Sequence, residues 1–149
     1  MVVDSRESQS RADSMATALR ASGMRLTHQR LEVVREIAGS DEHPEVEAVY
    51  RRVRERVPTI SLDTVYRTLG ALASLGLVNR ITATPGPARY DANTDRHHHF
   101  LCTSCGLVRD ISDPSLDAVR SAGQTSELGI VESVEINLKG VCRRCQASA

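Results

Sequence analysis

The chain has 149 residues, of which 40% are apolar and 3% aromatic, and its 19 basic and 19 acidic residues cancel. Such a chain can bury only a small core of aliphatic side chains, which favours two small domains or a dimer. The first 91 residues hold 13 basic and 12 acidic residues and the rest hold 6 and 7, so neither half is a strongly basic module, and composition argues weakly against nucleic-acid binding.

The sequence shows no apolar run typical of a signal peptide, and none that approaches the roughly 20 residues of a membrane span. We therefore expect a cytoplasmic protein with no membrane partner. In a reducing compartment, four cysteines arranged as two pairs are expected to hold a metal ion rather than to form disulfides.

In the first half, apolar residues recur at helical spacing in four segments. Residues 1–10 are expected to be disordered, and helices are predicted over 13–21, 27–38, 44–57 and 61–75, with Pro44 in the first turn of the third. Ser61 is a good N-cap for the fourth, and its apolar stripe consists of Leu62, Val65, Leu69 and Leu72. Two short strands, over 77–83 and 88–92, flank a Pro-Gly-Pro turn. This order outlines a winged helix.

In the second half, strands are predicted at 97–102, 106–112 and 131–142, with a helix beginning near Asp113. Val134, Ile136 and Leu138 alternate with polar residues, which is typical of a half-buried strand. The predicted fold is therefore α+β: a winged helix-turn-helix domain followed by a small three-stranded α/β domain. The domain boundaries are residues 1–90, a hinge at 91–96, and residues 97–149.

The cysteines form two C-x-x-C pairs, Cys102 with Cys105 and Cys142 with Cys145. Each two-residue gap lets both thiolates of a turn face one ion, and two such turns supply the four sulfurs of a closed structural zinc site. The alternative is a pair of redox dithiols. We favour Zn²⁺, which would stabilise the fold and do no chemistry.

The histidines suggest a second site. If residues 97–102 form a strand, His97 and His99 point to one face and His98 to the other, and Asp110 on the next strand could lie beside the first two. Two imidazoles and a carboxylate suit Fe²⁺ or Mn²⁺. The alternative is three solvated histidines.

Together, the motifs SLDTVYRTL, RYD, HHHFLCTSCG, VRD and GVCRRC, in this order, resemble the ferric uptake regulator (Fur) superfamily from about Leu19 to Cys145. The resemblance implies a homodimeric, metal-responsive transcriptional repressor whose first domain binds double-stranded operator DNA and whose second domain dimerises. It also implies a regulatory iron or manganese site at the hinge, with these ligands: His43, Asp91, His97, His99 and Asp110.

Aspartate at both carboxylate positions, Asp91 and Asp110, resembles the peroxide-responsive branch of the superfamily (PerR). That branch implies that iron-bound protein is oxidised by hydrogen peroxide at His43 or His97, after which the metal and the DNA are released. The alternative is a regulator of iron or other metal uptake without peroxide sensing. A further site of many relatives would use His98 and Asp117, but its third ligand falls at Val134, so we expect that site to be absent and His98 to face solvent.

For DNA, the fourth predicted helix is the expected recognition helix. Ser61, Thr64, Tyr66 and Arg67 are expected near the groove, although Tyr66 could instead pack in the core, and Arg25 and Arg80 are expected to contact phosphates. Two other classes of function remain: an iron oxygenase, for which no strand framework or substrate pocket is visible, and a zinc-stabilised interaction domain without DNA binding. We expect a regulator, not an enzyme.

Overall fold

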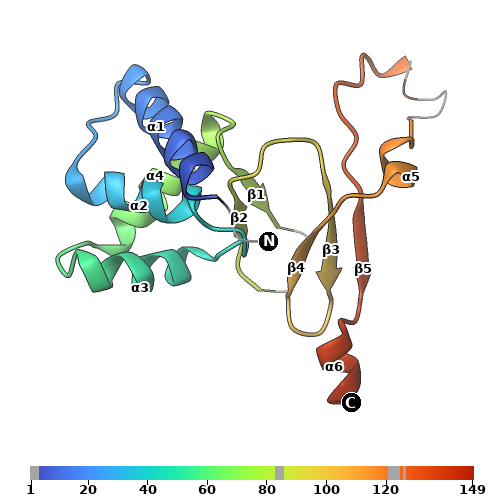
Figure 1. Cartoon of the computed structure of the whole chain (residues 1–149). Helices are drawn as coiled ribbons and strands as arrows, with labels where there is room; N and C mark the ends of the chain where they lie inside the picture. Colours follow the sequence, from blue (N-terminus) through green and yellow to red (C-terminus); the bar gives the residue numbers. More distant parts are fainter. Residues whose placement is uncertain (1–3, 83–85, 121–124, 126) are drawn as a thin grey trace. The chain divides into compact units, whose positions relative to one another are not determined.

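The computed structural model describes residues 4–82, 86–120, 125 and 127–149 (Figure 1). The chain divides into two compact units: the first comprises residues up to Thr82 together with Pro87–Thr94, and the second includes Asp95–Ala149. The fold contains both helices and strands, as predicted. Within the described residues, every helix is too short or too polar to cross a membrane.

The described residues of the first unit form a two-stranded hairpin and four helices: α1 (Ser5–Ala21), α2 (His28–Ala38), α3 (Val46–Arg56) and α4 (Leu62–Ser74). One apolar cluster joins them, and Leu19, Val34, Val49 and Leu69 in it are completely buried. On α4, Val65, Leu69 and Leu72 are buried as the predicted stripe requires, but Leu62 is 36% exposed. Thr68, three residues after Val65, is also buried, and its hydroxyl donates to the carbonyl of Thr64.

Helix α1 begins earlier than predicted, so Ser5 to Ser10 are helical rather than disordered. Its N-cap is Asp4, whose carboxylate accepts a hydrogen bond from the backbone N–H of Arg6 at 3.2 Å. Only Ala12, Met15, Ala16 and Leu19 of this helix are buried. Because the first two turns bury no apolar residue, they carry no periodic signal in the sequence.

The hairpin of the winged helix consists of β1 (Asn79–Ile81) and β2 (Arg89–Asp91), which pair antiparallel with Arg80 opposite Tyr90. Pro44 lies beside β2 and not in the first turn of α3, because its carbonyl accepts the backbone N–H of Tyr90 at 3.0 Å. Glu45 forms an isolated bridge with Arg89 and is the N-cap of α3. This extended segment carries His43 to the end of β2.

The second unit contains one three-stranded sheet in the order β4-β3-β5 (Figure 1). Strand β3 (His98–Cys102) pairs antiparallel with β4 (Val108–Ile111) and parallel with β5 (Asn137–Gly140). In the part of this unit that the structure describes there are two short α-helices: α5 (Pro114–Asp117), which begins where a helix was predicted, and α6 (Arg143–Ala147), which was not predicted.

Strand β5 is shorter than predicted, and Leu138 on it is 41% exposed. The predicted alternation holds only weakly, since Val134 and Ile136 precede the strand and are half-buried. The strand lies at an edge of the sheet, so one side of its backbone has no neighbouring strand within the described part of this unit.

Candidate metal centres and nucleic-acid interface

The four cysteines come from two turns in the second unit. Cys102 ends β3 and Cys105 follows in the turn to β4, which closes through the N–H of Cys102 to the carbonyl of Leu107 at 2.8 Å and through Gly106 at φ 72°. A residue with a side chain rarely adopts that angle. Cys142 is the N-cap of α6 and Cys145 lies within that helix.

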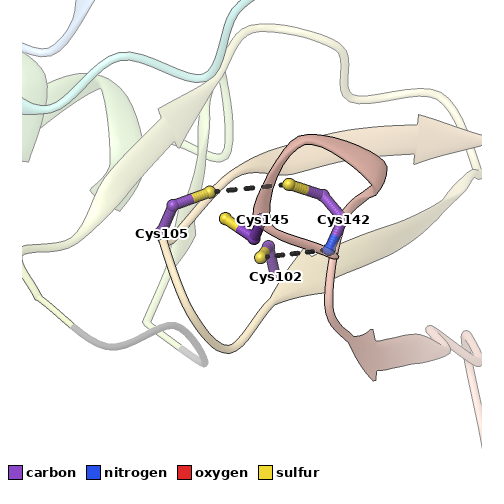
Figure 2. Close-up of side chains that lie close together, drawn as sticks. All are labelled: Cys102, Cys105, Cys142 and Cys145. Atoms are coloured by element: carbon purple, nitrogen blue, oxygen red, sulfur yellow. Dashed lines mark hydrogen bonds between the residues drawn. The ribbon is translucent and has the colours of Figure 1, made fainter. Parts of the chain in front are cut away.

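All four thiol groups point toward one another, and their sulfur atoms lie within 4.8 Å of one another (Figure 2). Cys105 Sγ and Cys142 Sγ are 3.8 Å apart. A tetrahedral zinc ion with zinc–sulfur bonds of about 2.3 Å separates its sulfurs by about 3.8 Å. The arrangement therefore fits the predicted four-cysteine zinc site. A redox dithiol would need only the two cysteines of one pair to lie close together, whereas here all four do.

The surroundings of these thiols favour negative charge on some of them and not on others. The backbone N–H of Cys142 donates to Cys102 Sγ at 3.3 Å, and this bond lowers the pKa of Cys102 to about 6. A backbone hydrogen bond from Leu107 likewise lowers the pKa of Cys105. For Cys145, the Ser104 hydroxyl lowers the pKa, but the neighbouring thiols outweigh it and raise the pKa to about 11. Four thiolates at this distance need a cation, which a divalent metal supplies.

His97, His99 and Asp110 converge in the same unit. His97 Nε2 and His99 Nε2 are 2.9 Å apart, and Asp110 Oδ1 lies 3.3 Å from the first and 3.5 Å from the second. Strand pairing explains the convergence, because His99 lies opposite Asp110 on β4 and His97 precedes β3 by one residue. The alternation predicted for residues 97–99 is therefore present.

The other ring nitrogens determine what these three atoms can bind. His97 Nδ1 lies 2.6 Å from the carbonyl oxygen of Asp95, and His99 Nδ1 lies 3.2 Å from Glu135 Oε1. A carbonyl oxygen and a carboxylate oxygen accept hydrogen bonds, so these two contacts favour the tautomer with the proton on Nδ1 in both rings. Both Nε2 atoms then present lone pairs toward Asp110, and three acceptors at this distance fit a cation.

His43 and Asp91 meet in the first unit. His43 Nε2 is 3.4 Å from Asp91 Oδ2, and both residues are almost fully buried, at 3% and 5% exposure. Asp91 Oδ1 also accepts the backbone N–H of Asn93 at 2.8 Å. His43 adopts φ 52°, and among the described residues other than glycine it alone has a positive φ. Strained backbone at a buried imidazole is typical of ligand and active sites.

The expectation that His98 faces solvent was wrong, because the side chain is completely buried. Its Nδ1 accepts the backbone N–H of Ile136 at 3.2 Å, which leaves Nε2 to donate to Asp117 Oδ1 at 3.1 Å. Burial follows because His98 points to the face of β3 opposite His97 and His99. The imidazole ties β3 to the chain before β5 and to the end of α5.

The predicted recognition helix is α4, and its predicted DNA contacts lie at or near its surface. Ser61 is the N-cap and accepts the N–H of Thr64 at 3.1 Å, so these two side chains begin the helix. Tyr66 is 46% exposed rather than part of the core, and its hydroxyl donates to Glu47 at 3.1 Å. That carboxylate raises the pKa of Tyr66.

Arg67 forms an ion pair with Asp63, with Nε and Oδ2 at 2.8 Å and both side chains 70% exposed. Arg80 is exposed on β1, and Arg25 is exposed in the segment between α1 and α2. No role was predicted for Asp63, Glu47 or Glu135, although these carboxylates contact three of the predicted site residues: Arg67, Tyr66 and His99. Asp63 lies four residues before Arg67, a spacing that predicts a helical ion pair, whereas the other two contacts join distant segments.

A profile described as "Ferric uptake regulator family" matches residues 21–139. The peroxide-responsive repressor PerR of Staphylococcus epidermidis is 32% identical over 129 residues, which cover 87% of this chain and 86% of that protein.

Two solved structures are similar in fold. A zinc-bound manganese uptake regulator is 30% identical with a TM-score of 0.67, covering 88% of this chain and 98% of that one. The ferric uptake regulator of Helicobacter pylori, described as having three functional metal binding sites, has a TM-score of 0.77 and 21% identity, covering 93% of each chain. The second likeness concerns the fold alone.

Proposed function

Because this chain belongs to the ferric uptake regulator family, we propose that it is a metal-dependent transcriptional repressor that binds operator DNA as a homodimer and senses hydrogen peroxide. The observation that carries the proposal is the convergence of His97 Nε2, His99 Nε2 and Asp110 Oδ1. A cation bound by these three atoms would explain why they lie so close together, with no need for a hydrogen bond between them.

In this proposal, the His43–Asp91 pair of the first unit and the three ligands of the second bind one Fe²⁺ or Mn²⁺ ion. Nitrogen and carboxylate ligands without sulfur suit these ions. An ion held by both units binds well to only one arrangement of them, so it shifts the dimer toward the state that fits DNA. The four cysteines hold a separate Zn²⁺ that stabilises the second unit.

The proposed dimer interface is the edge of the second unit. Leu128 and Ile130 are 88% and 95% exposed, and Leu138 and Val141 on or beside β5 are also exposed. Large apolar side chains that are this exposed are typical of an interaction surface. Because β5 is an edge strand, a second copy of the chain could cover both its backbone and these side chains.

Two observations support peroxide sensing. Both proposed carboxylate ligands are aspartates, and the relative with 32% identity is a peroxide-responsive repressor. Bound iron(II) would activate the peroxide without being consumed in the net reaction. Hydrogen peroxide is the two-electron oxidant: its O–O bond breaks, one oxygen atom is inserted into a ring C–H bond of His43 or His97, and the other leaves as water. The altered imidazole is a poorer ligand, so the metal is lost and the dimer leaves DNA.

The test is to load the purified protein with iron(II) without oxygen, add one equivalent of hydrogen peroxide, and map added oxygen by peptide mass spectrometry. We expect a gain of one oxygen on the peptide containing His43 or His97, and no gain in manganese-loaded protein. Gel shifts should show operator binding with Mn²⁺ that chelator abolishes and that peroxide abolishes only in the iron form.

A metal-uptake regulator is the second candidate, and the 30% identity with a manganese uptake regulator favours it. It predicts the same metal-dependent DNA binding but unmodified histidines after peroxide. Equal DNA affinity in chelator and in manganese would contradict both candidates.

A further inference from the structure

We infer that Glu135 is a positioning residue for the regulatory site, where it orients the His99 imidazole and sets the affinity of the site for a divalent cation. The inference rests on the proposed function, because it treats His99 as a ligand. It adds a residue that none of the sequence motifs contains.

The contact places a carboxylate on the side of the ring away from the convergent atoms. Glu135 Oε1 lies 3.2 Å from His99 Nδ1, while His99 Nε2 lies 3.5 Å from Asp110 Oδ1. His99 is 2% exposed and the side chain of Glu135 is 57% exposed, so the carboxylate reaches the buried ring from the protein surface. A ligating histidine commonly donates its second N–H to such a carboxylate, which fixes the tautomer and makes the ligating nitrogen more basic.

Backbone pairing determines where Glu135 lies. His99 pairs with Asn137 in the parallel register of β3 and β5, and the N–H of His99 donates to the carbonyl of Ile136 at 3.1 Å. On the other face, the N–H of Ile136 donates to His98 Nδ1 at 3.2 Å. Ile136 is therefore fixed on both sides, and this places its neighbour Glu135 beside His99.

The two histidine ligands are supported differently. His97 Nδ1 faces a neutral carbonyl oxygen, that of Asp95, at 2.6 Å, and that residue is only two positions away. His99 Nδ1 faces a carboxylate 36 residues away. The carboxylate carries a charge that the carbonyl lacks, so changing Glu135 alters the surroundings of His99 and leaves the Asp95 contact of His97 in place.

The experiment compares the full-length, zinc-loaded wild-type protein with Glu135→Gln and Glu135→Ala. Glu132→Ala, a change at an exposed glutamate three residues earlier, serves as the matched control. Mn²⁺ dissociation constants are measured by isothermal titration calorimetry, and zinc content is measured for each variant. Nitrogen-15 NMR of the histidine side chains in protein without the regulatory metal reports the His99 tautomer.

We expect Glu135→Ala to weaken Mn²⁺ binding by about 10- to 100-fold and to reduce the Nδ1–H tautomer of His99. Glu135→Gln should show a smaller loss, since its amide oxygen still accepts the hydrogen bond. Glu132→Ala and all zinc contents should match wild type. Wild-type affinity and tautomer in both Glu135 variants would overturn the inference. If wild type itself binds no Mn²⁺, or if His99→Ala binds it equally well, the proposed function fails instead.

Discussion

The positive φ of His43 leads to a prediction about stability that does not depend on any metal. Asparagine tolerates a positive φ, but a β-branched residue does not. At φ 52°, we expect His43→Val to reduce the free energy of unfolding by about 1–3 kcal/mol more than His43→Asn does. Urea denaturation followed by circular dichroism measures the difference, since the chain contains no tryptophan.

Measuring the Mn²⁺ affinity of the same two His43 variants distinguishes the effect of backbone strain from the loss of a metal ligand. Neither variant has an imidazole, so both should lose Mn²⁺ affinity under the proposed function, whatever their stabilities. Equal stabilities of the two variants would show that the left-handed conformation is not kept in solution.

At single residues, chemistry in the sequence was easier to predict than burial. The alternation of His97 and His99 followed from strand geometry alone, and the two C-x-x-C spacings placed the sulfurs correctly. His98 was misassigned because its partners, Asp117 and the N–H of Ile136, lie 19 and 38 residues away. No local pattern reveals such a partner.

Arg67 on α4 and Arg80 on β1 allow two kinds of DNA contact to be distinguished. If Arg67 reads a base edge, Arg67→Ala should cost about 1–3 kcal/mol of operator binding and relax the sequence preference at one position. If Arg80 contacts a phosphate, Arg80→Ala should weaken binding to all sequences and reduce the salt dependence of log K by about 1. Fluorescence anisotropy, with an operator selected from random DNA, measures both.

Arg51→Ala is the control for these two variants, because Arg51 is exposed on α3 outside the predicted recognition helix. It should bind DNA like wild type. A loss of affinity without any change in sequence preference for Arg67→Ala would reassign Arg67 to the phosphate backbone.

Helices α2 and α3 are joined by ion pairs around Glu32, which is 8% exposed. Arg35 Nη1 and Arg56 Nε lie 2.6 and 3.1 Å from its carboxylate oxygens. Burial alone would raise the pKa of Glu32, but the two arginines outweigh it and hold the pKa below the ordinary 4.5. A lowered pKa in the folded state adds stability above pH 4.5, and this is lost as the pH falls through the folded value.

We therefore expect Glu32→Gln to lower stability by about 1–3 kcal/mol at pH 7, and the difference from wild type to shrink as the pH falls below 4.5. Urea denaturation at a series of pH values measures it. Glu55→Gln, at an exposed position of α3, should differ little from wild type at any pH. A constant deficit for Glu32→Gln would mean that packing and not charge is responsible.

Elements with a continuous apolar stripe were predicted well, and elements held by single hydrogen bonds were not. The helices corresponding to α2 and α4 followed from spacing and from their Thr27 and Ser61 caps, whereas α3 followed from spacing alone and begins two residues after Pro44. The first turns of α1 depend on the Asp4 cap, and the short α6 follows a cysteine turn. The predicted third strand was too long because its alternation begins before the residues that pair with β3.

For the whole molecule, the exposed apolar residues of the second unit predict a concentration-dependent assembly. Ile130→Glu places a charge at a side chain that is 95% exposed in the single chain. We expect this variant to remain folded but to sediment as a monomer at concentrations where wild type is a dimer. Analytical ultracentrifugation measures this, with Glu127→Gln, an exposed nearby position, as the control. If the Ile130→Glu variant remains a dimer, Ile130 is not part of the dimer interface.

The parallel pairing of β3 and β5 has a consequence for how the regulatory site depends on zinc. Cys102 pairs with Gly140 at one end of this ladder, two residues before Cys142, and His99 pairs with Asn137 at the other. A one-residue slip of β5 would turn every side chain on it to the opposite face. Zinc bound to both cysteine turns would prevent that slip and so keep Glu135 beside His99. A newly made chain without zinc would lack this constraint, and under the proposed function it would bind the regulatory ion less well even with ample iron or manganese.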